Sequence, residues 1–378
     1  MTNVVIAGYV RSPFTPANRG ELARVRPDEI ATQVVKALVA KTGVKAEDLE
    51  DVIMGCAFPE GEQGLNIGRM VGLNAGLPQS TAGATINRFC GSSMQAIHMA
   101  AGAIAMGAGE AFVCAGVEGM TRVPMAGFNP MPHPGLYERM PEAYVSMGQT
   151  AENLAKQHQI PRAEQERFSL ASHRKAAAAQ AAGRFADEIV SIDSGKGRVE
   201  RDGGVRADAS LESMAKLEPA FDKEGTVTAA TSSPLTDGAA AVLVCSEAYA
   251  NKHGLTPLAR IRSIAVAGCA PELMGIGPVP ATQKALARAG LKLSDIDLIE
   301  LNEAFAAQAL AVVKELGVDE KMLNLDGGAI AIGHPMGASG ARITGKAASL
   351  LKREGGRLAL ATMCIGGGQG IATILEAV

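Results

Sequence analysis

The chain has 378 residues, a length that predicts two or three domains of ordinary size. Hydrophobic residues make up 47% of the chain and charged residues 20%, which is typical of a globular protein and excludes a disordered one. The net charge is −3 without any run of basic residues, so we expect no nucleic-acid partner.

The first residues, MTNVVIAGYVRSPF, contain a short apolar segment but lack the basic start and long apolar core of a signal peptide, so we expect none. No later apolar stretch reaches the length of a membrane-spanning helix. The cysteines form no C-x-x-C pair, which argues against a zinc ribbon or a disulfide framework and predicts a reducing, cytoplasmic location. They are Cys56, Cys90, Cys114, Cys245, Cys269 and Cys364.

Two distant segments share one order of predicted elements. Residues 36–54 (KALVAKTGVKAEDLEDVIM) and residues 284–301 (KALARAGLKLSDIDLIEL) each predict a helix that ends at a glycine, then an acidic turn and a strand. The two glycines, Gly43 and Gly290, lie 247 residues apart. This similarity suggests an internal duplication.

The same offset relates a second pair of junctions, because it places Cys90 opposite Gly337. The apolar run TINRFC precedes the helical pattern GSSMQAIHMAAGAIAMG, and GAIAIGHPMG precedes ASGARITGKAASLLKR, so both junctions predict strand, turn and helix. We therefore expect a layered α/β protein with two pseudo-symmetric halves, right-handed crossovers and mainly parallel strands. The N-terminal half comprises residues 1–117 and 236–256, and the C-terminal half residues 257–378.

Residues 118–235 differ from both halves and predict an insertion. They begin with a Met-, Pro- and Gly-rich segment, continue with a charged helical pattern and include DSGKGRVERDGGVRAD, which predicts an exposed loop. Because long excursions from a compact fold usually carry function, we expect a lid or a binding flap.

Cys90 directly precedes a predicted helix, whose unpaired N–H groups and dipole favour a nucleophilic thiolate. The alternative is a small buried cysteine, as most free cysteines are. His334 lies in the glycine-rich IGHPMGASG, at the junction related to that of Cys90 by the duplication. The two junctions would place a base beside a nucleophile, although a histidine bonded within a tight turn is the alternative.

Cys364 ends a predicted strand and is followed by three glycines, whose N–H groups could face a developing oxyanion. A tight turn between strands explains the glycines equally well. Asn302 and Glu303 lie where a predicted strand passes into a helix. Asn302 suits either helix capping or a role in holding water or polarising a carbonyl.

The remaining histidines indicate no site. We expect His98 to be a satisfied core residue, His133 to lie in a surface loop, and His158, His173 and His253 to be solvated. No pair has the spacing of metal ligands, so we predict no catalytic metal.

Four blocks together resemble the active-site segments of thiolases. They are NRFCGSSMQA around Cys90, NEAFAAQ from Asn302, GGAIAIGHPMGASGAR around His334 and CIGGGQG from Cys364. Their order and spacing match, and the likeness extends over essentially the whole chain. The sequences CGSSMQA, GPVPA and LATMCIGGGQGIA are most similar to those of bacterial 3-ketoacyl-CoA thiolases of fatty-acid β-oxidation.

This resemblance implies the thiolase fold, with two βαβαβαββ halves in an αβαβα arrangement and an inserted loop domain. It implies an acyltransferase in which Cys90 attacks a 3-ketoacyl-CoA and retains the acyl group as a thioester until CoA removes it. His334 would take the Cys90 proton and help to bind the thioester oxygen, with Asn302 holding a water nearby. Cys364 would exchange protons with the acetyl-CoA enolate and with CoA. The backbone N–H groups of Cys90 and Gly366 would form a second oxyanion hole, and Glu303 belongs to the same substrate-contacting set as Asn302 and Gly366.

CoA enters as a co-substrate, and the resemblance implies no permanently bound cofactor. It places Ser233 against the pantetheine arm, Met147 and Phe305 along the same channel, and Arg206 at the nucleotide end. It also implies a homodimer or homotetramer, or association with a hydratase/dehydrogenase subunit of a fatty-oxidation complex.

Three positions depart from the family pattern. Asp326 and Thr236 stand where Asn is usual, and Glu218 stands where Arg is usual. We expect none of them to touch the catalytic positions, whereas Thr236 and Glu218 alter the segment expected to contact CoA.

Three alternatives stay open. A decarboxylating ketoacyl synthase shares the fold but uses a second His or Asn in place of the Cys364 acid/base. A biosynthetic acetoacetyl-CoA thiolase has the same catalytic residues, because the chemistry is reversible and the acyl pocket decides chain length. A non-catalytic CoA-binding subunit would not need the intact set of Cys90, His334 and Cys364.

Overall fold

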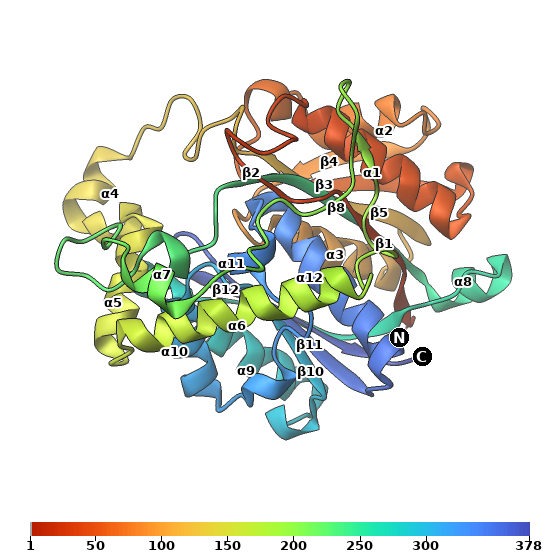
Figure 1. Ribbon diagram of the computed structural model, residues 1–378. Helices are drawn as coiled ribbons and strands as arrows, with labels where there is room; N and C mark the ends of the chain where they lie inside the picture. Colours follow the sequence, from red (N-terminus) through yellow and green to blue (C-terminus); the bar gives the residue numbers. More distant parts are fainter. Residues whose placement is uncertain (1) are drawn as a thin grey trace.

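One large mixed sheet runs through the molecule, whose computed structural model describes residues 2–378 (Figure 1). Its strands follow the order β10-β11-β12-β9-β1-β8-β5-β3-β4, with β2 paired to β8 and a separate hairpin of β6 and β7. The strands are β1 (Val4–Arg11), β2 (Thr15–Pro16), β3 (Leu49–Gly55), β4 (Ala82–Ile86), β5 (Ala111–Gly119), β6 (Ile192–Asp193), β7 (Arg198–Val199), β8 (Thr236–Ser246), β9 (Ala259–Gly268), β10 (Leu298–Leu301), β11 (Leu358–Ile365) and β12 (Gln369–Glu376).

Helices connect these strands and cover both faces of the sheet. They are α1 (Pro27–Thr42), α2 (Ile67–Asn74), α3 (Ser92–Ala105), α4 (Pro134–Arg139), α5 (Met147–Gln157), α6 (Arg162–Ala181), α7 (Leu211–Ala215), α8 (Glu247–His253), α9 (Pro278–Ala289), α10 (Ala306–Leu316), α11 (Ala329–Ile332) and α12 (Met336–Glu354). No helix in the part of the chain that the structure describes is both long and apolar enough to cross a membrane.

The two halves of the sheet have mirrored strand orders, β1-β8-β5-β3-β4 and β9-β12-β11-β10. The counterpart of β4 in the second half is reduced to one parallel bridge between Ile299 and Leu323. The halves join through two residue pairs between β1 and β9. Helices α1 and α9 both end at a left-handed glycine, Gly43 (φ 69°) and Gly290 (φ 66°), as the duplicated pattern predicts.

Three apolar clusters divide the layers. One lies between α1, α2 and the first half of the sheet, and another between α9, α10 and the second half. The third surrounds α3 and α12, which pack against each other and against strands of both halves. These two helices therefore form the central layer, which supports the predicted layered α/β fold.

Two expectations about strands are wrong. Three strand pairs of the main sheet are parallel (β3–β4, β3–β5 and β10–β11) and six are antiparallel, so the sheet is not mainly parallel. The reason is that β8 and β12 return antiparallel beside β5 and β11. The run GAIAI before His334 forms the short helix α11 and not a strand.

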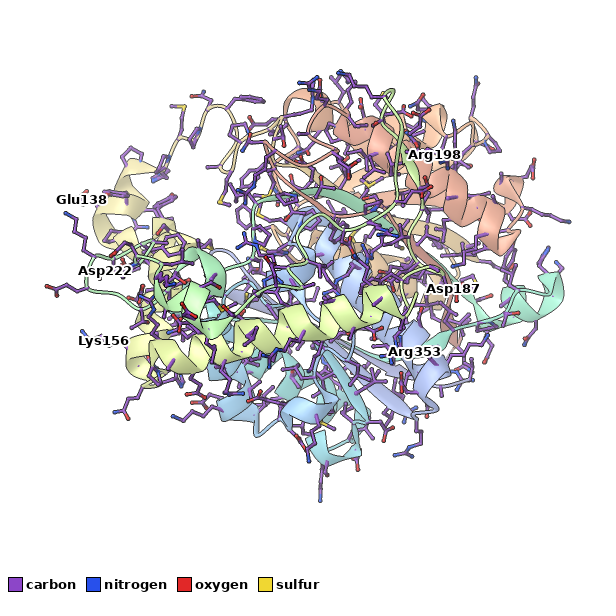
Figure 2. All side chains as sticks on the ribbon, viewed as in Figure 1. Glu138, Lys156, Asp187, Arg198, Asp222 and Arg353 are labelled. Carbon is purple, nitrogen blue, oxygen red and sulfur yellow. The ribbon has the colours of Figure 1, made fainter. Side chains whose placement is uncertain are left out.

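The segment 118–235 contains α4 to α7 and the β6–β7 hairpin, and Figure 1 shows α6 crossing the front of the molecule with α4, α5 and α7 gathered at one side. Glu138 and Asp222, labelled in Figure 2, mark the outer end of this group. The segment DSGKGRVERDGGVRAD is only partly an exposed loop. Within it Asp202 is buried and its carboxylate accepts two hydrogen bonds from the Arg11 guanidinium, at 2.6 and 2.8 Å.

Candidate active site

Cys90 lies in the tight turn between β4 and α3. The turn is closed by hydrogen bonds from Gly91 N to Arg88 O (3.0 Å) and from Ser92 N to Phe89 O (3.1 Å). Phe89, directly before the cysteine, has φ 43°, a left-handed conformation that costs a bulky residue energy. The surroundings of the turn impose this geometry and thereby fix the direction of the Cys90 side chain.

The Cys90 thiol is protonated in the resting site. Its burial raises the pKa to about 11, although the N–H groups of Gly366 and of Cys90 itself favour the thiolate and lower it. The Gly366 N–H is therefore close to the sulfur of Cys90. A nucleophile at this position needs a base to remove its proton at neutral pH.

His334 lies in the turn before α12 and is buried. Its Nδ1 is 2.6 Å from Ser339 Oγ, and its Nε2 is 3.4 Å from Asn302 Nδ2. Because an amide nitrogen can only donate, Nε2 is the acceptor and the proton resides on Nδ1, which donates to Ser339. Burial, with a smaller effect of Arg342, lowers the pKa of His334 to about 3, so the imidazole is neutral and able to accept a proton.

Glycines allow the start of α12 to contact both α3 and β5 directly. A Cβ on Gly340 of α12 would lie 2.4 Å from Met94 N of α3, and a Cβ on Gly116 of β5 would lie 2.1 Å from Gly337 O of α12. The Ala341 N–H also donates to Ser93 Oγ at 2.8 Å. The two helix N-termini, and with them Cys90 and His334, therefore converge at the contact between the halves.

Cys364 lies near the end of β11, and a tight turn at Gly367 (φ 77°) and Gly368 (φ 81°) leads into β12. Burial, and then the neighbouring Cys90, raise the pKa of the Cys364 thiol well above its usual value. The glycines thus serve a turn between strands, while the same turn places the Gly366 N–H beside Cys90. A tight turn between strands and a source of N–H groups for an oxyanion are therefore compatible interpretations of this segment.

Asn302 and Glu303 have different surroundings. Asn302 is buried beside His334, and its Oδ1 has no hydrogen-bond partner among the described residues, which leaves an acceptor for a water or a substrate. The Glu303 carboxylate accepts hydrogen bonds from Ser172 Oγ (2.7 Å), Asn324 Nδ2 (2.8 Å) and Ile330 N (3.1 Å). Through these hydrogen bonds, Glu303 holds the segment before His334 in place.

The residues expected to contact CoA form two neighbouring groups. Met147 and Phe305 belong to the apolar cluster that contains Cys364, and the Met147 sulfur lies beside Gly366. Ser233 and Arg206 line one cavity of about 500 Å³. Other residues of its wall include Pro16, Asn18, Arg19, His173, Gly203, Ala229 and Ile330, so two arginines and no carboxylate face the cavity.

The buried carboxylate of Glu118 is not predicted from the sequence. Glu118, in β5, accepts hydrogen bonds from Ala57 N (2.8 Å), Gly337 N (3.0 Å) and Gln63 Nε2 (2.9 Å). It thereby ties the loop after β3 to the start of α12. Its position inside an apolar strand is the only signal in the sequence, and a single acidic residue there does not identify its partners.

We expect none of the three departures from the family pattern to touch a catalytic position, and for Thr236 this is wrong. The Thr236 hydroxyl accepts a hydrogen bond from the His334 N–H at 3.1 Å, so one departure does touch a catalytic position. Asp326 is buried and contacts Lys346 at 2.7 Å and Arg184 at 3.3 Å. Glu218 is exposed and makes no ion pair within residues 2–378.

The histidines outside the site match our expectation in part. His98 is buried with Nε2 2.8 Å from Thr373 Oγ1, and His133 is exposed, both as predicted. His173 is buried and its Nδ1 accepts the Arg206 N–H at 3.2 Å, and His158 and His253 are half-buried, so the prediction of solvated side chains is wrong for these three. No group of three or more potential metal ligands occurs among the described residues.

Comparisons with known proteins agree with this geometry. Residues 4–248 match the family described as thiolase, N-terminal domain, and residues 255–377 match thiolase, C-terminal domain. A protein of Shewanella frigidimarina described as 3-ketoacyl-CoA thiolase is 50% identical over 389 residues, and the alignment covers both chains in full. A protein of Marinomonas with the same description is also 50% identical, and the alignment covers 98% of it.

Two solved structures share the fold. The Bacillus anthracis acetyl-CoA acetyltransferase has a TM-score of 0.92 at 41% identity, with all of this chain and 99% of that chain covered. The human mitochondrial 3-ketoacyl-CoA thiolase in complex with CoA has a TM-score of 0.92 at 40% identity, with 100% and 98% covered. The chain belongs to the thiolase family.

Proposed function

We propose that this enzyme is a 3-ketoacyl-CoA thiolase, which uses CoA to cleave a 3-ketoacyl-CoA into acetyl-CoA and a shortened acyl-CoA. The curated relatives with this description are about 50% identical over the full length. The observation that carries the proposal is the pairing of two buried cysteines with a neutral histidine and the Gly366 N–H.

In the first half-reaction, the Nε2 of His334 takes the proton of Cys90, and the thiolate attacks the 3-keto carbon. The N–H groups of Gly366 and Cys90, beside the sulfur, are suited to hold the 3-keto oxygen as negative charge develops on it. The bond between C2 and C3 then breaks, its electron pair forms the enolate of acetyl-CoA, and the Cys364 thiol protonates C2. The acyl group remains on Cys90 as a thioester.

In the second half-reaction, the Cys364 thiolate removes the proton of an incoming CoA thiol. The CoA sulfur attacks the acyl-Cys90 carbonyl, and the Cys90 thiolate leaves and recovers its proton from His334. Every step is reversible, because a thioester preserves the activation of the acyl group.

The cavity lined by Ser233 and Arg206 is proposed to receive the CoA arm and its phosphorylated end. Two exposed arginines and no carboxylate in its wall suit an anionic ligand, while the apolar Met147 and Phe305 lie on the side of Cys364. The human relative crystallised with CoA supports a CoA site in this fold.

The second candidate is an acetoacetyl-CoA thiolase, favoured by the likeness to the Bacillus anthracis acetyl-CoA acetyltransferase. Thiolysis of 3-ketoacyl-CoAs from four to sixteen carbons separates the two, with turnover read from the loss of substrate absorbance. We expect activity across the series. Activity on the four-carbon substrate alone would establish the second candidate, and no thiolysis at any length would reject both.

We also propose a homodimer or homotetramer. Strand β4 is an edge strand of the main sheet, and the exposed apolar side chains of Leu65 and Phe89 lie on the segments around it. Sedimentation velocity should give a species of at least twice 38.9 kDa. Leu65→Lys should weaken the association of the subunits. Met131→Lys in the 118–235 segment is the control. A wild-type monomer at micromolar concentration would reject this proposal.

Two further expectations accompany the function. Association with a hydratase/dehydrogenase subunit would join successive steps of β-oxidation. All six cysteines are free thiols, which suits the reducing cytoplasm that the sequence predicts.

A further inference from the structure

The Thr236 hydroxyl makes two hydrogen bonds directly beside His334. Thr236 is the first residue of β8 and is almost fully buried. Its Oγ1 donates to Pro234 O at 2.6 Å and accepts the His334 N–H at 3.1 Å. A hydroxyl performs both functions at once, because it has one donor and two acceptor positions.

The segment that carries Thr236 is anchored at its other end to the block of Asn302. Ser233 donates to Ala304 O through both its N–H and its Oγ, each at 3.0 Å. Ser232 also forms an isolated antiparallel bridge with Phe305. Residues 232–236 therefore connect the Asn302 block to the backbone of His334, the two groups whose side chains meet at Nε2.

The turn at His334 is shaped around this threonine. Gly333 has φ 117°, and a Cβ on it would lie 2.8 Å from both Cγ2 and Oγ1 of Thr236. On the following residue, the Asp237 carboxylate accepts the Thr121 N–H at 2.8 Å, which fixes the start of β8. The segment of His334, which donates to Thr236, thus packs directly against the threonine. Thr236 itself is held in place by the bond of its neighbour Asp237 to Thr121.

We propose that Thr236 is a positioning residue for the reaction, which holds the His334 backbone and thereby keeps Nε2 beside Asn302, where the turns of His334 and Cys90 converge. The proposal rests on the proposed thiolase function for its kinetic consequence. Thr236 touches neither the substrate nor the reacting atoms and acts only through His334.

The test compares Thr236→Val, which keeps the shape and removes the hydroxyl, with Thr236→Ser, which keeps the hydroxyl. We expect Thr236→Val to lower the kcat of thiolysis by at least 10-fold with the KM of the 3-ketoacyl-CoA changed by less than 3-fold. Thr236→Ser should retain kcat within 3-fold. Thr231→Val is the matched control, because Thr231 is a buried threonine of the same segment that bonds only to Thr228.

A second readout needs no substrate turnover. Alkylation of Cys90 by iodoacetamide at pH 7, followed by peptide mapping, should slow by at least 10-fold in Thr236→Val and remain near wild type in Thr236→Ser and Thr231→Val. Thr236→Ala, which can create only a small cavity, replaces Thr236→Val if the latter does not fold.

Each outcome is decisive. Unchanged kcat and alkylation in a folded Thr236→Val or Thr236→Ala protein would overturn the proposal. Equal losses in Thr236→Ser and Thr236→Val would also overturn it, because packing and not the hydroxyl would then be responsible. A wild-type protein without thiolysis rejects the proposed function, yet the alkylation rates still test Thr236.

Discussion

At the residue scale, the site combines a thiol that burial keeps protonated with a histidine that burial keeps neutral. The pKa of Cys90 is raised to about 11 and that of His334 is lowered to about 3. Neither residue is reactive alone, so proton transfer from one to the other has to accompany attack on the substrate. Cys364, with its own raised pKa, needs a substrate carbanion or a CoA thiol as its proton partner.

Cys364→Ser should lower the kcat of thiolysis by about 10²–10⁴-fold, the usual contribution of a general acid or base. Cys90 should still be alkylated by iodoacetamide, since its base is His334. Cys245→Ala is the control, because this cysteine lies at the far end of β8 and outside the site. A Cys364→Ser or Cys364→Ala enzyme with near wild-type thiolysis would contradict the assigned role.

The pH profile of kcat/KM should show no inflection near pH 6.5, the ordinary pKa of histidine. Because the pKa of His334 is lowered, the base stays unprotonated as the pH falls through this region, and the acid limb should lie below about pH 5. Initial rates between pH 4.5 and 8, with circular dichroism to confirm folding, provide the measurement. An acid limb centred between pH 6 and 7 would show that His334 is more solvated than the structure indicates.

Cys90, His334, Asn302 and Cys364 could be singled out from the sequence because each ends or begins a predicted element. Their assigned roles stay predictions. Thr236 and Glu118 could not be found in this way, since the hydrogen bonds that join them to His334 and Gly337 come from backbone N–H groups 98 and 219 residues away. Such bonds depend on the backbone path and leave no pattern in side-chain types.

At the element scale, α12 packs so closely against α3 and β5 that only glycine fits at several contacts. Periodicity predicts both helices well, because each has a long helical pattern after a glycine-rich turn. It fails for α11, since an apolar run of five residues does not distinguish a strand from a buried helix.

Gly340→Ala in α12 should destabilise the fold by about 1–3 kcal/mol, the usual cost of overpacking. The new Cβ would lie 2.4 Å from the backbone nitrogen of Met94, so α12 must shift and carry His334 with it, and kcat should fall. Urea denaturation and thiolysis rates provide the two measurements.

The matched control is Gly102→Ala in α3, where a Cβ meets nothing within 4 Å. This change should stabilise the protein by about 0.5–1 kcal/mol, because alanine favours the helix over glycine. Equal effects of the two substitutions would contradict the close approach of the helices.

At the scale of the whole molecule, buried charges connect the two halves and the inserted segment. Asp326 and Glu188 both contact Lys346 of α12, at 2.7 and 2.9 Å, and Glu188 also pairs with Arg11 of β1 at 2.9 Å. Arg353, which bonds to Asp326, lies on the same side of the molecule as Asp187 in Figure 2, and both line a second cavity of about 470 Å³.

Asp326→Asn should destabilise the protein by about 1.5–3 kcal/mol, because Lys346 and Arg353 lose a buried charged hydrogen-bond partner, while Lys346 keeps Glu188. The pKa of Asp326 is lowered to about 2, so its contribution is present above pH 4 and is lost as the pH falls from 4 to 2. Urea denaturation at pH 7 tests the loss, with Glu212→Gln at an exposed ion pair as a control expected within about 0.5 kcal/mol of wild type. Equal stability of Asp326→Asn and wild type would show that the network is neutral.

The family and the layered α/β class could be predicted from the sequence, and the comparisons confirm both. The mainly antiparallel pairing of the sheet could not, because alternating helices and strands do not reveal that β8 and β12 return antiparallel beside β5 and β11. The division at residues 117, 235 and 256 stays a prediction.

The place of β8 between β1 and β5 has a consequence for biosynthesis. When the ribosome has completed β5, the strand that belongs beside it is still about 130 residues away, or roughly 6–26 s of translation. Throughout this interval β1 and β5 expose unpaired edges, and the nascent chain cannot close its first sheet. The N-terminal half is therefore first in the sequence but depends on late synthesis, and we expect chaperones to bind the nascent chain during this interval.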